Sequence, residues 1–196
     1  VTAVREHKPD ILALSAMLLI PNYPYYVVFF YTGLAVFFTC LNGRENNDVV
    51  FTLTLPVSKR DAVRARFAFT VLLEAAQIAA AVPFAILRGA MPLPGNAVGM
   101  DANVALFGLS LVLLGIFNLS FYSIYYRNVD HVGKAFVSAS VWMFVFIAAA
   151  ETCDHTVPFF RDRLDTPDPG FLPEKLAVLA AGLAIFALLT AAAYRK

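Results

Sequence analysis

The sequence predicts an all-α integral membrane protein with six transmembrane helices, both chain ends inside the cell, and a cytoplasmic segment between the second and third spans. The first observation is composition. Of the 196 residues, 60% are hydrophobic and only 15% are charged, whereas soluble domains carry about 25% charged residues. The second observation is that the charges fall between long uncharged runs. About 20 helical residues cross a bilayer core, and open strands cannot satisfy their backbone in lipid. We therefore expect one transmembrane domain over residues 1–196.

The predicted spans cover residues 9–22, 24–41, 67–87, 102–126, 133–151 and 175–194. The runs Tyr25–Leu41, Ala102–Tyr126 and Leu176–Tyr194 contain no charged residue, and Phe67–Leu87 contains only one. The run Ala135–Ala150 reaches spanning length once flanking residues are included. The first uncharged run, Ile11–Ile20, is too short for a full crossing, so we expect the first span to be short or truncated.

The orientation follows from the positions of the basic residues. With both termini inside, all but four of the 15 Lys and Arg residues lie on cytoplasmic segments. The outer ones are Arg88, Arg161, Arg163 and Lys175. An excess of Lys and Arg in inner loops usually marks the cytoplasmic side. The outer cluster Glu151, Cys153, Asp154 and His155 is interpreted as solvated loop residues, and no metal site is expected.

Glycines within one span and tyrosines at the span ends indicate where the helices contact each other and the membrane interface. Gly108 and Gly115 are seven residues apart and share one helix face, which indicates helix packing. Tyrosines occur at the span ends, where an aromatic belt would anchor the protein at the membrane interface. These tyrosines are Tyr23, Tyr25, Tyr26, Tyr122, Tyr125, Tyr126 and Tyr194.

The inner segment 42–66, NGRENNDVVFTLTLPVSKRDAVRAR, is polar, then apolar, then strongly charged. Asp48 is a plausible N-cap for a short helix that carries Phe51, and Pro56 should end that helix because the residue before proline disfavours helical geometry. Ser58 then caps a new helix, with Asp61 at the capping-box position. We call residues 42–66 the coupling segment.

The new helix is strongly basic, since it carries Lys59, Arg60, Arg64 and Arg66. Two interpretations are open on charge and periodicity alone. The segment is either a basic elbow that holds lipid headgroups, with about 1 kcal/mol for each cation near an anionic surface, or a docking element for a cytosolic partner.

The run RENNDVVFTLTLPVSKRDAVRARF resembles the ABC-2 type transporter permeases, in particular the small six-span branch that works with a separate ATP-binding protein. The signature of that branch is matched by LPVSKRD at residues 55–61. IPNYPYY at 20–26 is similar to the family's first outer turn, and FNLSFYSIYYRNVDHVGKAF at 117–136 is similar to its second cytoplasmic loop with the flanking spans. The resemblance extends from about residue 8 to residue 194.

The resemblance implies a permease dimer, homomeric or heteromeric, in a bacterial cytoplasmic membrane, paired with ATP-binding subunits that hold ATP and Mg. Export is favoured over import, because the outer loops are small. The coupling segment would contact the ATP-binding subunit, with the loop 127–134 as a lesser contact. The residues expected to make this contact are Asp48, Phe51, Leu55, Pro56, Ser58, Lys59, Arg60, Asp61 and Arg64.

The chain itself does not carry the pattern of an ATPase. No GxxxxGK[ST] occurs, and Gly133-Lys134 is followed by Ala135, so the glycines that let backbone N–H groups approach phosphates are missing. We expect no cofactor in this chain and no enzymatic activity of its own. The net charge of +1 gives no argument for a nucleic-acid partner.

Glu74 is the one charge that lies away from the ends of a predicted span, and Gln77 lies one turn further on the same helix face. An intramembrane carboxylate costs about 2.5–3.5 kcal/mol at the span centre and is by default a functional candidate. One hypothesis places Glu74 and Gln77 in the translocation path or an inner gate. The other pairs Glu74 with a polar group of a neighbouring span, such as Asn118 or Ser120, as a structural contact.

Two other function classes are open on the sequence. A non-transporting membrane assembly or immunity protein would need only packing faces, which this composition supplies. A membrane-embedded lipid-modifying enzyme is less favoured, because no HExxH or paired-acid motif is present.

Overall fold

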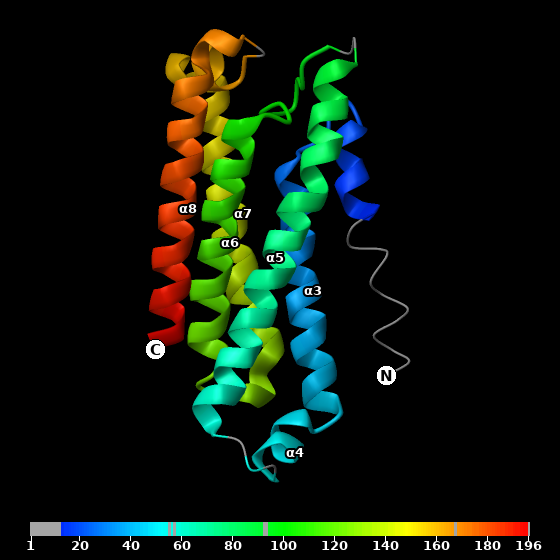
Figure 1. Ribbon diagram of the computed structural model, residues 1–196, viewed down its shortest axis with the longest axis vertical. Coiled ribbons are helices and arrows are strands. Elements are labelled where there is room, and N and C mark those ends of the chain that lie inside the picture. The colour runs from blue at the N-terminus through cyan, green and yellow to red at the C-terminus, as the bar shows by residue number, and fades with distance from the viewer. Residues whose placement is uncertain (1–12, 55, 57, 92–93, 167, 196) are drawn as a thin grey trace.

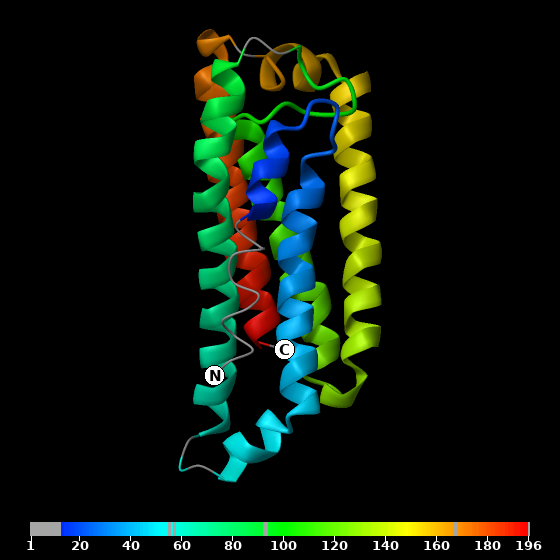
Figure 2. The ribbon, with the colours of Figure 1, turned by 90° about the vertical axis from the view of Figure 1, so that its right-hand side faces the viewer.

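The computed structural model describes residues 13–54, 56, 58–91, 94–166 and 168–195. Five long helices run side by side along the long axis of the molecule (Figures 1 and 2): α3 (Tyr26–Glu45), α5 (Lys59–Ala90), α6 (Val104–Tyr125), α7 (Val132–Thr156) and α8 (Leu172–Arg195). The short helix α4 (Asp48–Thr54) lies at one end of this bundle. Three 3-10 turns, η1 (Leu14–Leu19), η2 (Val129–His131) and η4 (Pro169–Phe171), and the π-helical turn η3 (Phe160–Leu164) complete the fold. No strand occurs among these residues.

The all-helical fold class is confirmed, and five of the helices are long and apolar enough to cross a membrane. They correspond to the second to sixth predicted spans. In the predicted first span, 9–22, the described part holds only the six-residue turn η1, and residues 9–12 lie outside the described residues. The count of six spans and the orientation therefore stay predictions. We call the two ends of the bundle the α4 end, which is predicted to face the cytoplasm, and the opposite end.

Two helices extend well beyond their predicted spans. Helix α5 begins at Lys59, directly after the predicted Ser58 cap, and its first turns precede the predicted span at residue 67 because they are polar. Helix α7 continues to Thr156 instead of residue 151. This extension places the outer cluster of Glu151, Cys153, Asp154 and His155 on helix α7. Asp154 is only 4% exposed. The interpretation of that cluster as solvated loop residues is therefore wrong for Asp154.

Helix α6 is the centre of the bundle and packs most extensively on α8, then on α7. Glycines make the α6–α8 approach possible. A Cβ atom on Gly108 would lie 2.6 Å from the Val178 carbonyl oxygen, and one on Gly182 would lie 2.7 Å from the Gly108 carbonyl carbon. A Cβ on Gly115 would lie 3.1 Å from Phe186 Cα. The prediction that Gly108 and Gly115 serve helix packing is thus confirmed.

Helix α5 packs differently. Its backbone lies close to η1 and α3, whereas long polar and aromatic side chains connect it to α6. Phe67 and Tyr122 have ring centroids 4.3 Å apart, and Thr70 Oγ1 and Tyr122 Oη are hydrogen-bonded at 2.5 Å. Helix α5 is therefore connected to α6 by individual side chains, whereas its backbone approaches η1 and α3.

Candidate functional site

The coupling segment forms α4, a proline-containing turn and the first turns of α5. Helix α4 begins at Asp48, so the cap position is Asn47, one residue earlier than predicted, and the Asn47 carbonyl accepts from the Phe51 N–H at 3.0 Å. Asn47 has a φ of 54°, a left-handed conformation that asparagine tolerates well. The helix ends at Thr54, two residues before Pro56, as predicted. Leu55 lies outside the described residues.

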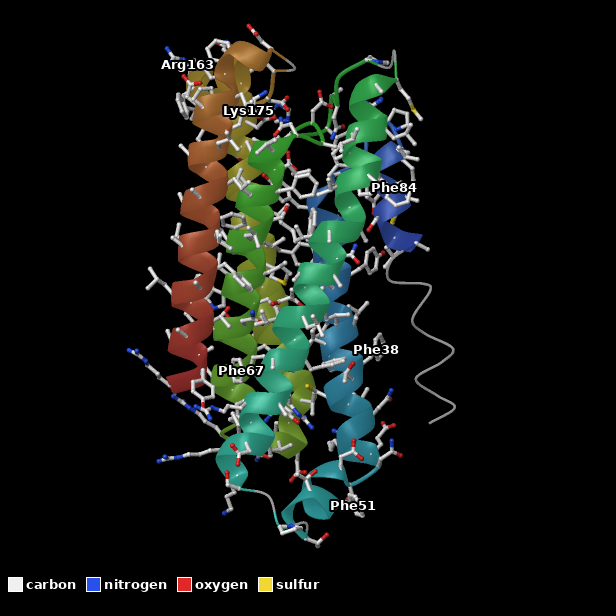
Figure 3. The ribbon with its side chains drawn as sticks, in the orientation of Figure 1. Phe38, Phe51, Phe67, Phe84, Arg163 and Lys175 are labelled. Carbon is white, nitrogen blue, oxygen red and sulfur yellow. The ribbon has the colours of Figure 1, made fainter. Side chains whose placement is uncertain are left out.

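Phe51 is the most prominent side chain of α4. It is 66% exposed and lies at the tip of the α4 end, away from the helix bundle (Figure 3). A single exposed hydrophobic residue is common on protein surfaces, but aromatic rings on protruding elements are frequent anchors at protein interfaces. Phe51 is thus an exposed ring at the tip of this end of the bundle.

The start of α5 is rigidly capped. Ser58 Oγ accepts a hydrogen bond from the Asp61 N–H at 3.1 Å and donates one to Asp61 Oδ2 at 2.6 Å. The predicted cap at Ser58 is confirmed, although the Asp61 carboxylate binds the hydroxyl group and not the Ser58 N–H. Asp61 therefore has one carboxylate oxygen bound to the cap, and its negative charge lies beside the cations of the same helix turn.

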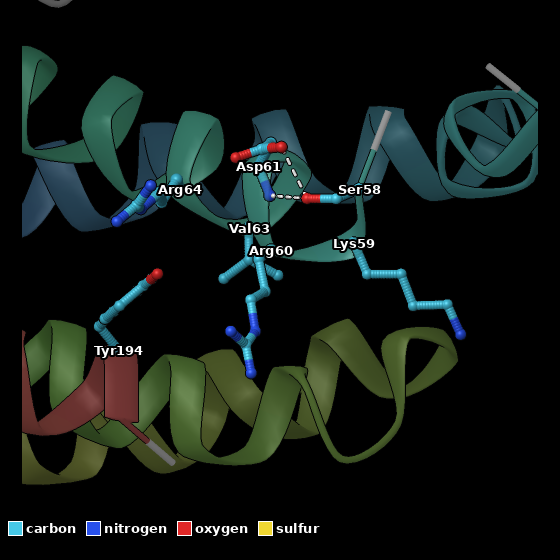
Figure 4. Close-up of a pocket in the computed structure, with 7 residues that line it drawn as sticks. All are labelled: Ser58, Lys59, Arg60, Asp61, Val63, Arg64 and Tyr194. Atoms are coloured by element: carbon cyan, nitrogen blue, oxygen red, sulfur yellow. Dashed lines mark hydrogen bonds between the residues drawn. The ribbon is translucent and has the colours of Figure 1, made fainter. Parts of the chain in front are cut away.

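The predicted basic residues separate into two groups. Lys59, Arg60 and Arg64 are exposed and line a cavity of about 570 Å³ together with Tyr194 of α8 (Figure 4). We call this the basic cavity. Arg66 instead turns inward, where it donates hydrogen bonds to Tyr125 Oη and to Cys40 Sγ. Only the first group is available to a partner outside the chain.

Glu74 and Gln77 both lie inside the bundle, and each is 1% exposed. Asn118 Nδ2 of α6 donates to Glu74 Oε2 at 3.0 Å and to Thr190 Oγ1 of α8 at 3.1 Å. Gln77 Nε2 donates to Ser15 Oγ at 3.0 Å. The network therefore joins α5, α6, α8 and η1 in mid-bundle, with Asn118 as the partner of Glu74. A role in a path or gate is not visible in this arrangement and stays a hypothesis.

This network leaves several buried acceptors unused. Glu74 Oε1, Gln77 Oε1 and Asn118 Oδ1 have no hydrogen-bond partner in the described part of the chain. Unpaired buried polar atoms are costly, so this layer is one of the places where the bundle interior is incompletely hydrogen-bonded.

Sequence reasoning missed the groups that surround Glu74. Thr70, Thr190 and Ser15 gave no signal, because single hydroxyl residues are ordinary in membrane helices. Tyr122 and Tyr125 did give a signal, but the interpretation as an interfacial belt is wrong for them. Each is 1% exposed, since α6 is enclosed by its neighbours and turns these rings into the interior. Tyr25 and Tyr26 are buried in the same way.

The opposite end carries a second polar group of residues. Asp165 Oδ1 accepts from the Asp101 N–H at 2.5 Å, and Lys175 donates to the Thr166 carbonyl. Burial raises the pKa of Asp165 to about 7, and the nearby Asp154 and Asp101 carboxylates act in the same direction, while the Asp101 N–H and Lys175 oppose them. Figure 3 shows Lys175 at this end of the bundle.

This raised pKa predicts a pH dependence of stability. Between about pH 4 and pH 7 the folded chain holds a proton on Asp165 that the unfolded chain has released, so stability falls as pH rises through that window and is level above it. We expect a lower thermal unfolding midpoint at pH 8 than at pH 5 in detergent. Asp165→Asn should remove this component, and the exposed Asp162→Asn should not. An unchanged pH slope in Asp165→Asn would refute the assignment.

Comparison with known families agrees with the arrangement of helices. A family model described as ABC-2 family transporter protein matches residues 10–194, which is nearly the whole chain. No curated protein and no solved structure matches the chain. The match, together with five helices of spanning length, identifies the chain as a multi-pass membrane protein of the ABC-2 transporter family, of the permease type.

Proposed function

We propose that this chain is the permease subunit of an ATP-driven exporter in a bacterial cytoplasmic membrane. Two permease subunits would form the translocation path, and separate ATP-binding subunits would hold ATP and Mg and would dock on the α4 end. The observation that carries the proposal is the exposed Phe51 on a short helix that protrudes from the bundle and leads directly into α5. The absence of a phosphate-binding glycine motif in the sequence is consistent with a motor in another chain.

Helix α5 gives this docking site a physical route to the middle of the bundle. It is continuous from Lys59 to Ala90, so its start and Glu74 lie about 22 Å apart at 1.5 Å per residue. The Ser58–Asp61 cap ties the turn after α4 to the helix. A displacement at the start of α5 would therefore be carried along this continuous helix to Glu74.

The contacts of α5 favour such a movement. Its connection to α6 at this depth is the Asn118–Glu74 hydrogen bond, and the adjacent Gln77 bonds to η1. Hydrogen bonds between membrane helices are worth about 0.6 kcal/mol on average, so they are exchanged at low cost. We infer that Glu74 and Gln77 form an inner gate, which opens when α5 shifts and the buried acceptors gain new donors.

The docking proposal is tested by co-purification with the ATP-binding protein encoded beside this chain. Loss of a buried aromatic anchor commonly costs about 2 kcal/mol or more, roughly 30-fold in affinity. We expect Phe51→Ala to weaken the complex by that factor. The matched control is Phe159→Ala, which removes a 44% exposed ring at the opposite end.

Two outcomes would overturn the proposal. If no ATP-binding protein associates in detergent or in lipid nanodiscs, the chain is better described as a membrane assembly protein. If the purified chain alone hydrolyses ATP clearly above background, the motor does not reside in a partner.

A further inference from the structure

We propose that the basic cavity between the start of α5 and the end of α8 binds the phosphate headgroup of an anionic phospholipid, drawn from the membrane leaflet at the α4 end. The cavity has a volume of about 570 Å³ and is lined by Ser58, Lys59, Arg60, Asp61, Val63, Arg64 and Tyr194. This inference concerns a lipid ligand and does not depend on the docking of an ATP-binding subunit.

The cavity carries an excess of positive charge. Lys59, Arg60 and Arg64 have no salt-bridge partner in the part of the chain that the structure describes. One acidic side chain, Asp61, also lines the cavity, and one of its oxygens accepts a hydrogen bond from the Ser58 hydroxyl. Three cations and one carboxylate therefore leave two positive charges that an anionic ligand would balance.

The spacing of the two arginines suits a phosphate group. Arg60 and Arg64 are four residues apart, so they lie on one side of α5, one turn above the other. Figure 4 shows Lys59, Arg60 and Arg64 extending from α5 in different directions, with the Tyr194 hydroxyl pointing across the cavity toward α5. The two exposed arginine side chains would turn toward each other to hold one phosphate. Guanidinium groups bind phosphate oxygens through two parallel hydrogen bonds, and a tyrosine hydroxyl can donate a further one.

The position of the cavity favours a lipid over a soluble anion. Tyr194 is the second-last residue of α8, so the cavity lies where a predicted span ends and headgroups gather. Its walls also include apolar surface: Val63 lines it, and the Tyr194 ring packs edge-on against Phe67 with centroids 5.5 Å apart. A phosphate with an attached apolar body matches this mixed lining better than free phosphate does.

The same geometry favours a lipid over an acidic segment of a partner protein. The cavity opens between two helices of spanning length, α5 and α8. Helix α4, which protrudes furthest at this end, lies apart from α8 (Figure 1). A lipid reaches a gap between spans from within the bilayer, whereas a protein docking on Phe51 approaches from the water beyond α4.

The test is native mass spectrometry of the detergent-solubilised chain titrated with phosphatidylglycerol or phosphatidylcholine. We expect one phosphatidylglycerol to bind in preference to phosphatidylcholine. Arg60→Gln/Arg64→Gln should weaken this binding roughly 30-fold, from about 1 kcal/mol for each cation. The matched control Arg127→Gln/Lys134→Gln removes two exposed cations of the 127–134 loop, outside the cavity, and should change binding less than about threefold. Size-exclusion profiles and unfolding midpoints check the fold of both variants.

If the double variant fails to fold, Lys59→Gln supplies the test, because this exposed side chain makes no hydrogen bond among the described residues. It should weaken phosphatidylglycerol binding about fivefold. Equal binding of the two lipids, or equal losses in the cavity and control variants, would overturn the proposal.

Two competition experiments distinguish a bound lipid from free phosphate and from a partner protein. Displacement of phosphatidylglycerol by an equal concentration of inorganic phosphate would show a site for free phosphate instead of a lipid. Displacement by the ATP-binding subunit would assign the cavity to the protein interface. Retention of the lipid in both arms supports the proposal, and it does so whether or not Phe51→Ala weakens the subunit complex.

Discussion

Gly182→Ala is expected to destabilise the bundle by about 2–3 kcal/mol, the cost of overpacking a tight interior contact. The added methyl group would lie 2.7 Å from the Gly108 carbonyl carbon and 2.8 Å from Gly108 Cα. Both atoms belong to the backbone of α6, so no side-chain rotation relieves the overlap, and α8 must move away from the helix on which it packs most extensively. The measurement is the free energy of unfolding in detergent micelles.

The matched control is Gly89→Ala near the end of α5. A Cβ atom there would meet no atom within 4 Å, and alanine is favoured over glycine inside a helix by about 0.5–1 kcal/mol. This variant should therefore be neutral or slightly more stable. Similar stabilities for the two variants would contradict a glycine-dependent contact between α6 and α8.

The second large effect is expected at the Glu74 network. Asn118→Leu should cost about 1.5–3 kcal/mol of stability, because it removes the donor to Glu74 and leaves a buried carboxyl group without a partner. Glu74→Gln should stay within about 1 kcal/mol of the wild type, since the amide oxygen can still accept from Asn118 Nδ2. Ser120→Ala is the control on the same helix, because Ser120 is the alternative partner suggested by the sequence and makes no hydrogen bond to Glu74.

The same variants separate the gate from a purely structural contact. If the gate depends on the carboxyl group of Glu74 and not only on its acceptor oxygens, Glu74→Gln should fold normally and yet lower transport-coupled ATP hydrolysis at least tenfold in reconstituted vesicles, because an amide cannot exchange a proton or carry charge. Normal transport by a folded Glu74→Gln chain would rule out the gate and leave the network as a helix-packing device.

The sequence by itself was sufficient for the fold class and for the positions of the five long helices. Insertion into a bilayer depends on the summed hydropathy of a contiguous run, which is a local property. The cap at Ser58 and the end of α4 before Pro56 are equally local, because each depends on neighbours within a few residues. Both were confirmed, and the cap of α4 lies one residue earlier than predicted.

Only the tertiary structure decided which side of each helix is inside. Helix α6 is apolar around its whole circumference, so no periodic pattern marks its buried face. The burial of Tyr122 and Asp154, the choice of Asn118 over Ser120 by Glu74, and the meeting of Gly108 with Gly182 all depend on residues far apart in the chain. In a membrane the lipid is as apolar as the interior, so hydrophobicity cannot distinguish the two, and close packing and hydrogen bonding between helices decide.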